Sequence, residues 1–183
     1  FFLGVLALLW IVMPACSLLD RFHGEKARLE RAVRIMFGWW LRLLAAAGLV
    51  RAVPARGVPL DGPCVVVSNH PGLFDVVFLI REIPSLSVLV KSSLPRRLPL
   101  RPLLRALGSV MVADFQKVTP MDVAEDAIRQ IRSGKRLQMF PEGTRSPEGG
   151  LRPFRAGAFK MARLTGVPVQ PVLIRNVPPF LPK

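Results

Sequence analysis

The sequence predicts an α/β domain in which helices flank a mixed β-sheet, with membrane-associated helices ahead of it at the N-terminus. Short apolar runs rich in β-branched residues alternate along the chain with segments of helical periodicity, which is the pattern of α/β proteins. Residues 1–50 are instead apolar and basic, and they contain all three Trp residues. Pro and Gly recur between positions 50 and 63, so we expect an N-terminal membrane anchor at 1–50, a linker, and a second domain at 58–183.

The individual elements follow from local signals. The run at 64–67 is β-branched and follows Gly62 and Pro63, which suits a buried strand that ends at Ser68. Comparable runs predict further strands at 86–90, 110–113, 136–140 and 169–174. Capping residues and apolar periodicity predict helices at 72–80, 120–133 and 155–164.

The composition indicates acidic ligands. The chain of 183 residues carries 26 Lys and Arg against 12 Asp and Glu, a net charge of +14, and 51% of its residues are hydrophobic. High charge with low hydrophobicity would indicate disorder or a nucleic-acid-binding tail, whereas high charge with high hydrophobicity suits an anionic membrane surface. The length is sufficient for one domain with a sizeable core.

Positive charge is concentrated between residues 91 and 105. The basic residues there are Lys91, Arg96, Arg97, Arg101 and Arg105. This patch could bind headgroup phosphates, the phosphopantetheine arm of an acyl donor or an acidic carrier protein, or it could be a solvated face with an apolar underside. Because the patch contains no aromatic residue on which bases could stack, we expect no nucleic-acid partner.

The first 19 residues contain no charged side chain until Asp20. A helix of about 19 residues just crosses a hydrocarbon layer of ~30 Å, so this segment could span a membrane or lie in its interface. The alternative is a secretory signal peptide.

A basic amphipathic helix is expected at 25–44. Its apolar residues recur at helical spacing and are Leu29, Val33, Met36, Phe37, Trp40 and Leu44. Arginine and tryptophan side chains suit an anionic membrane interface, and the predicted membrane-binding residues are Trp10, Arg28, Arg31, Arg34, Trp39 and Trp40. The alternative is that the apolar face packs on the protein's own core. On the first interpretation the protein is membrane-associated, at the cytoplasmic face of the inner membrane if it is bacterial.

Segment 69–75, NHPGLFD, is a polar island between two apolar runs. Pro71 is tolerated in the first turn of a helix, so a helix that starts there places Asp75 about one turn beyond His70. His can take and return a proton near neutral pH, and a nearby carboxylate fixes its tautomer and stabilises the imidazolium. We therefore predict that His70 and Asp75 form a general-base dyad. The alternative is a surface His followed by an Asp that caps a helix.

A second polar island, segment 140–146 (FPEGTRS), also follows a strand-like stretch. The guanidinium of Arg145 offers a planar fork that matches phosphate oxygens, and Gly143 allows the backbone to approach a ligand closely. The alternative is that Glu142 and Arg145 pair to close a turn.

Together the two islands resemble one family. The pair His70-x4-Asp75 and the block at 142–145 (EGTR) look like the two signature motifs of the glycerolipid acyltransferases, of which lysophosphatidate (1-acyl-glycerol-3-phosphate) acyltransferase is the typical member. Segments 91–94 (KSSL) and 167–172 (VPVQPV) resemble weaker blocks of that family, and the resemblance extends over about 58–174. It implies a glycerolipid acyltransferase-like fold and a substrate-binding set of Lys91, Glu142, Gly143, Thr144 and Arg145.

The resemblance also implies the chemistry. Acyl transfer from a thioester to an alcohol needs a base for the hydroxyl proton and donors or positive charge for the developing oxyanion. His70 would deprotonate the acceptor, Asp75 would orient His70, and the alkoxide would attack the thioester of acyl-CoA or acyl carrier protein directly. No cofactor or metal is expected. Cys16 and Cys64 are too few for a zinc cluster or a disulfide framework, and we expect Cys64 in the core.

One position departs from the family pattern. The family usually has an Arg where this chain has Asp114, which leaves two acceptors open: a lysophospholipid, or a phosphate-free lipid such as an amino-acid lipid or a glycolipid. A non-catalytic basic module that binds anionic lipid or nucleic acid is a further alternative. Because Phe1 is not a Met and the family would continue beyond Lys183, we expect the chain to be a fragment that is incomplete at its C-terminus.

Overall fold

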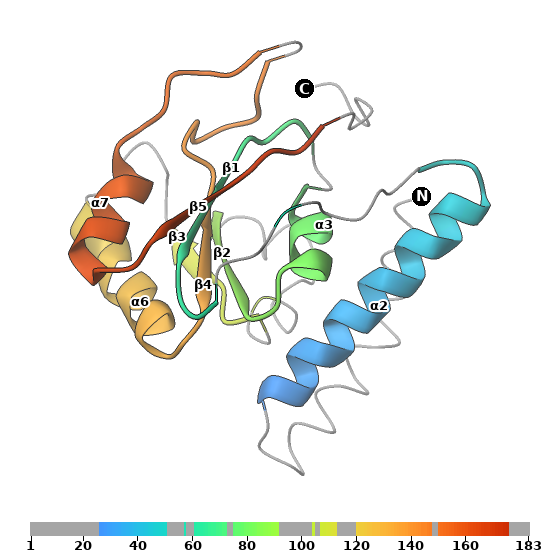
Figure 1. The fold of residues 1–183 in the computed structure, drawn as a ribbon, viewed down its shortest axis with the longest axis horizontal. Helices are drawn as coiled ribbons and strands as arrows, with labels where there is room; N and C mark the ends of the chain where they lie inside the picture. Colours follow the sequence, from blue (N-terminus) through green and yellow to red (C-terminus); the bar gives the residue numbers. More distant parts are fainter. Residues whose placement is uncertain are drawn as a thin grey trace.

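The computed structural model describes residues 26–50, 57, 61–72, 75–91, 104, 107–112, 120–147 and 150–175, and every structural statement below concerns these residues. They form a parallel β-sheet between two layers of helices (Figure 1). The strands are β1 (Val65–Ser68), β2 (Leu86–Lys91), β3 (Val110–Val112), β4 (Arg136–Met139) and β5 (Val169–Val172). Their order across the sheet is β3-β2-β4-β1-β5.

All the predicted strands are present, and each begins at or next to the predicted first residue. The expectation of a mixed sheet is wrong for the described strands, because every neighbouring pair is parallel. The physical reason lies in the connections. Helices join β1 to β2, β3 to β4 and β4 to β5, and a crossover through a helix returns the chain to the same edge of the sheet and makes the next strand parallel.

The described helices are α2 (Lys26–Ala46), α3 (Asp75–Glu82), α6 (Pro120–Arg132) and α7 (Gly157–Thr165). Helices α6 and α7 agree with prediction to within two residues. Helix α3, however, begins at Asp75 and not near Pro71. The carboxylate of Asp75 accepts a hydrogen bond of 2.8 Å from the backbone N–H of Gly72, and this contact holds residue 72 in a turn ahead of the helix.

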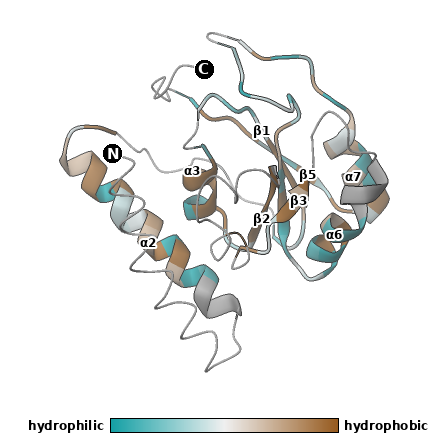
Figure 2. Ribbon diagram, turned by 180° about the vertical axis from the view of Figure 1, so that it is seen from behind, coloured by the Kyte–Doolittle hydropathy of each residue, from teal (hydrophilic) through white to brown (hydrophobic). Residues whose placement is uncertain are grey.

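Strand β1 is buried on both faces, which is why segment 64–67 reads as a continuous apolar run. Val65 and Val67 of β1 pack in one cluster with residues of α6 and α7. Cys64 and Val66 point the other way, into a cluster that includes residues of α2 and α3. Figure 2 shows the apolar colouring of β2 and β3 between the helices and the alternation of apolar and polar residues along α2.

Helix α2 packs on this core. The side chains of Val33, Met36 and Phe37 are buried in the cluster that contains Val66. The apolar face predicted for the membrane is therefore the face that contacts the protein itself, and residues 26–46 belong to the same folded unit as the sheet.

Two residues predicted to contact the membrane are placed on this inner side by the structure. The ring of Trp40 is 6% exposed and packs in a cluster with Leu41 and Leu44. The guanidinium of Arg34 donates from Nε and Nη2 to the carbonyl oxygen of Arg81, over 3.3 and 3.0 Å, and so ties α2 to the end of α3. The helical period puts both positions on the side that faces α3.

The other predicted membrane residues fall into two groups. Arg31 and Trp39 are exposed on the outer side of α2. Trp10 and the side chain of Arg28 lie outside the described residues, as does the whole predicted apolar segment 1–19. Within the part of the chain that the structure describes, no helix is both long enough and apolar enough to cross a bilayer.

Candidate active site

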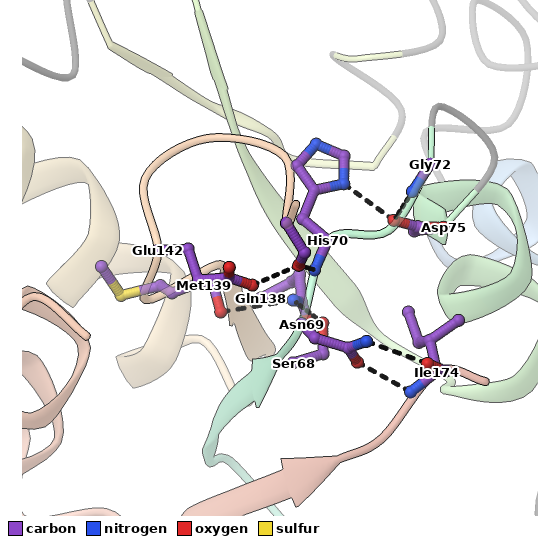
Figure 3. Close-up of polar contacts among 10 residues, drawn as sticks. Ser68, Asn69, His70, Gly72, Asp75, Gln138, Met139, Glu142 and Ile174 are labelled. Carbon is purple, nitrogen blue, oxygen red and sulfur yellow. Dashed lines mark hydrogen bonds and ion pairs between the residues drawn. The ribbon is translucent and has the colours of Figure 1, made fainter. Parts of the chain in front are cut away.

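The two polar islands lie next to each other at the carboxyl ends of two neighbouring strands. Strands β1 and β4 are neighbours, with Val67 paired to Met139, so the segments that follow them leave the sheet side by side (Figure 3). In open sheets of parallel strands, ligands bind at the carboxyl ends of the strands. Segments 69–72 and 140–147 occupy that position here.

His70 and Asp75 contact each other as predicted. Nδ1 of His70 lies 2.8 Å from Oδ2 of Asp75, whose side chain is fully buried. An ionised carboxylate only accepts hydrogen bonds, so it holds the proton on Nδ1 and leaves Nε2 with a lone pair. The imidazole itself is 21% exposed and can be reached by a substrate. This geometry is the one that the predicted general-base dyad requires.

A ring that the sequence did not single out fixes the plane of the imidazole. Phe140 stacks on His70 with a centroid distance of 4.1 Å and an interplanar angle of 14°. Its position at the start of segment 140–146 was the only signal in the sequence. With Asp75 holding Nδ1 and Phe140 covering one face of the ring, rotation of the imidazole is restricted.

Glu142 is held inside the protein and its exposed fraction is 3%. Oε1 accepts a hydrogen bond from the hydroxyl of Ser146, and Oε2 accepts one of 2.7 Å from the backbone N–H of Arg152. Ser146 and Arg152 were also missed at the sequence level. Both oxygens of Glu142 are therefore engaged by the protein.

The rest of the block at 142–145 forms a tight loop. Gly143 has a φ of +67°, and a Cβ at this position would come within 3.0 Å of Nε of Arg155, so no larger residue fits without strain. Thr144 is exposed, Arg145 is half-buried, and the carbonyl oxygen of Arg145 accepts a hydrogen bond of 3.2 Å from Nε of Arg152.

The loop of segment 140–147 is joined directly to His70. The backbone N–H of Ser146 donates to the carbonyl oxygen of His70 over 2.8 Å. In return, the backbone N–H of His70 donates to Oγ of Ser146 over 3.1 Å. The two islands are thus held together through the main chain of the predicted base.

Polar side chains link the ends of neighbouring strands beneath the site through hydrogen bonds. The amide of Asn69 donates to the carbonyl oxygen of Ile174 over 2.9 Å and accepts from its N–H over 2.8 Å, which joins the ends of β1 and β5 (Figure 3). Nε2 of Gln138 donates to Oγ of Ser68 over 2.8 Å and so links β4 to β1. These contacts fix the spacing of the three strands from which the site is built.

Several predicted residues are not brought to the site by the described structure. Lys91 is the last residue of β2, but its side chain lies outside the described residues, as do Asp114 and residues 92–103 and 105 of the basic patch. Among the residues that are described, no group of three or more His, Cys, Asp or Glu side chains is placed to hold a metal ion.

Cys64 is a core residue, as predicted. Its side chain is fully buried at the start of β1. Burial raises the pKa of the Cys64 thiol, and the nearby charge and hydrogen bond of Arg136 offset only part of this shift. The thiol is therefore kept neutral and is not an activated nucleophile.

Comparison with known proteins agrees with the two motifs. A family model described as Acyltransferase matches residues 50–175. The 1-acyl-sn-glycerol-3-phosphate acyltransferase BAT2, chloroplastic, of Brassica napus is 31% identical over 122 residues, which cover 67% of this chain and 36% of that protein. The human 1-acyl-sn-glycerol-3-phosphate acyltransferase beta is 34% identical over 120 residues, or 64% of this chain and 43% of its own. The chain thus spans less than half the length of these relatives.

A solved structure shares the fold. The crystal structure of the 1-acyl-sn-glycerophosphate (LPA) acyltransferase PlsC from Thermotoga maritima superposes with a TM-score of 0.71 at 23% identity, over 92% of this chain and 68% of that one. The likeness is to its α/β architecture with a parallel sheet flanked by helices. The matched family model covers both polar islands and every described strand, which confirms the predicted resemblance: the chain belongs to the acyltransferase family.

Proposed function

We propose that this chain carries the catalytic site of a glycerolipid acyltransferase, which moves a fatty acyl group from acyl-CoA or acyl carrier protein to the hydroxyl of a lysophospholipid. The observation that carries the proposal is the contact of 2.8 Å between Nδ1 of His70 and the buried carboxylate of Asp75, at the carboxyl end of a parallel strand. The names of the related proteins support the choice of 1-acyl-glycerol-3-phosphate as the acceptor.

In the proposed reaction Nε2 of His70 takes the proton of the acceptor hydroxyl. The acceptor oxygen attacks the thioester carbonyl, a C–O bond forms, and the C–S bond breaks with its electron pair on sulfur. The imidazolium then returns the proton to the thiolate. Asp75 stabilises the imidazolium while it exists, and because it is buried its charge acts with little solvent screening.

Product identification tests the proposal. The protein is incubated with acyl-CoA or acylated carrier protein and a panel of lipid acceptors, free thiol is measured, and the lipid product is identified by mass spectrometry. We expect thiol release that depends on a lysophospholipid. If no donor gives thiol release that depends on an acceptor, the proposal is contradicted and a binding module is favoured.

A phosphate-free acceptor is the second candidate, and Asp114 is the observation that favours it. A carboxylate within a few ångströms of a bound phosphate would cost on the order of 1 to several kcal/mol at intermediate effective dielectric. Asp114 itself lies outside the described residues. The same acceptor panel separates the two candidates when it includes an amino-acid lipid and a glycolipid.

Arg145 is proposed to bind the acceptor phosphate, and its replacement by Ala is expected to raise the KM for lysophosphatidate. A hydrogen-bonded contact between charged groups contributes about 1.5–3 kcal/mol, which corresponds to roughly a 10- to 150-fold change. The KM for a phosphate-free acceptor should change far less. Arg132→Ala, at an exposed position at the end of α6, is the matched control. If Arg145→Ala retains the full preference for phosphate, another residue reads the headgroup.

We infer that the outer side of α2 contacts the membrane. Ile35, Trp39 and Leu43 are 55, 65 and 68% exposed, and their spacing of four residues places them in one stripe along the helix. Arg42 stacks on Trp39 at 5.5 Å, and Arg31 is exposed on the same side. An exposed apolar stripe with basic neighbours suits the interface of an anionic bilayer. In a bacterium this would be the cytoplasmic face of the inner membrane.

The double variant Trp39→Ser, Leu43→Ser is expected to bind vesicles of anionic lipid about a hundredfold more weakly. Burial of each large apolar side chain contributes about 1.5–3 kcal/mol, and part of that is lost at each site. The control is Phe159→Ser, Leu164→Ser, the same kind of change at two exposed positions of α7, which lies on the opposite side of the sheet (Figure 1). Vesicle sedimentation makes the comparison, and equal pelleting of both double variants would contradict the assignment of the α2 stripe.

A further inference from the structure

We propose that Ser146 and Glu142 are positioning residues for the base: Ser146 holds the main chain of His70, and the buried carboxylate of Glu142 holds the hydroxyl of Ser146. The inference rests on the proposed function of His70. It gives Glu142 a role other than the substrate contact that the sequence suggests, and it gives Ser146 a role in the reaction.

The hydrogen bonds that link Glu142, Ser146 and His70 can run in one direction only. An ionised carboxylate has no proton to give, so the hydroxyl of Ser146 must donate to Oε1 of Glu142. The lone pairs of the same hydroxyl are then free to accept the backbone N–H of His70, at 3.1 Å. The N–H of Arg152 donates to the other oxygen of Glu142. Two donors thus meet the buried carboxylate of Glu142 directly, and the N–H of His70 is linked to it through the hydroxyl of Ser146.

Ser146 forms hydrogen bonds with both backbone polar groups of His70. It accepts from the N–H through Oγ, and it donates to the carbonyl oxygen through its own N–H, at 2.8 Å. Residues 69–71 adopt no helix or strand, so no regular ladder holds this part of the main chain. The side chain of His70 is fixed by Asp75 and Phe140, but those contacts orient the ring only if the backbone beneath it stays in place.

The position of Nε2 therefore depends on a contact that spans 76 positions of sequence. A base that is displaced by about 1 Å from the acceptor hydroxyl can lose roughly a hundredfold in rate, even when the substrates bind normally. The expected signature of losing the Ser146 hydroxyl is a fall in kcat with little change in KM.

The first test compares four variants by steady-state kinetics. Ser146→Ala is expected to lower kcat roughly ten- to a hundredfold, with the KM for both substrates within about twofold. Ser146→Thr keeps the hydroxyl and should restore most of the activity. Ser133→Ala, which removes a hydroxyl bonded to Gln130 at the far end of α6, should behave as wild type. Glu142→Gln is expected to resemble Ser146→Ala, because an amide NH₂ must face the donor of either Ser146 or Arg152.

The double variant separates the two possible roles of Glu142. If Glu142 acts through Ser146, adding Glu142→Gln to Ser146→Ala should lower kcat little further, because residues in one network are not additive. If Glu142 contacts the substrate, the two losses should multiply and KM should rise. Multiplied losses would overturn the proposal.

A second readout does not depend on activity. The chain has two His residues, His23 and His70, so the imidazole signals in an NMR spectrum of histidine-labelled protein can be assigned with His70→Ala. In Ser146→Ala the ring signals of His70 should shift or broaden while those of His23 stay unchanged. Unchanged His70 signals together with unchanged kcat would overturn the positioning role. A shift of those signals in a protein whose His70→Ala variant remains fully active would instead leave the positioning role standing and refute the proposed base.

If Ser146→Ala does not fold, as judged by its thermal transition, the comparison of Glu142→Gln with Glu125→Gln decides the matter. Glu125 is exposed on α6, so the control changes the same group far from the site. Loss of kcat and a shift of the His70 signals in the first variant alone are expected, and equal behaviour of the two variants would refute the proposal.

Discussion

His70→Ala is expected to lower turnover about 10²- to 10⁴-fold, because a positioned general base contributes an effect of that size to the transition state. Binding of the acyl donor should be nearly unchanged, since the imidazole acts on the acceptor hydroxyl. The measurement is the initial rate of acceptor-dependent thiol release, with the lipid product identified by mass spectrometry.

The stability of the variant serves as the control for this result. His70 is partly exposed, so removing its ring leaves no large cavity, and the thermal transition should move little. A variant that folds, binds the donor and still forms the correct product at close to the normal rate would rule out His70 as the base.

Asp75→Asn is expected to lower turnover about 10- to 10³-fold, no more than His70→Ala. Oδ2 of Asp75 accepts hydrogen bonds from both His70 and Gly72, whereas the buried Oδ1 has no hydrogen-bond partner among the described residues. An Asn can therefore keep its oxygen toward His70 and Gly72 and place its NH₂ where Oδ1 lay. The change removes the negative charge that stabilises the imidazolium while it preserves the shape of the site.

Asp126→Asn is the matched control for this variant. Asp126 is exposed on α6 and pairs at 3.1 Å with Arg129 three residues later, a surface contact of little consequence. It should keep wild-type kinetics and stability. Equal turnover of Asp75→Asn and wild type would show that the carboxylate only caps α3, which is the alternative that the sequence left open.

The elements of the fold could be predicted because their signals are local. β-branched runs bounded by Gly and Pro marked β1, and start and stop residues marked α6. The contact between His70 and Asp75 was also predictable, since the two residues are five positions apart. Even so, the start of α3 was placed too early, because the hydrogen bond from Gly72 to Asp75 leaves no mark in the sequence other than the Asp itself.

The features that could not be predicted depend on contacts between residues that are far apart in the sequence. Nothing in the sequence of β1 states that its partners are β4 and β5, and so the parallel arrangement was missed. Amphipathicity identified α2 but not which partner its apolar face would contact, because protein core and lipid present the same apolar surface. The role of Glu142 was likewise hidden, since it depends on how Ser146 meets a residue 76 positions earlier.

The place of β1 in the sheet determines when the candidate site can assemble during synthesis. On the ribosome β1 is the first of the described strands to appear, yet both of its neighbours, β4 and β5, come from much later in the chain. Chains are synthesised from the N-terminus at about 5–20 residues per second, so β1 and the segment around His70 remain unpaired for several seconds. The candidate site therefore assembles only when synthesis of this region is nearly complete, and a nascent chain that stops before residue 136 contains His70 and Asp75 but neither of the strands that pair with β1.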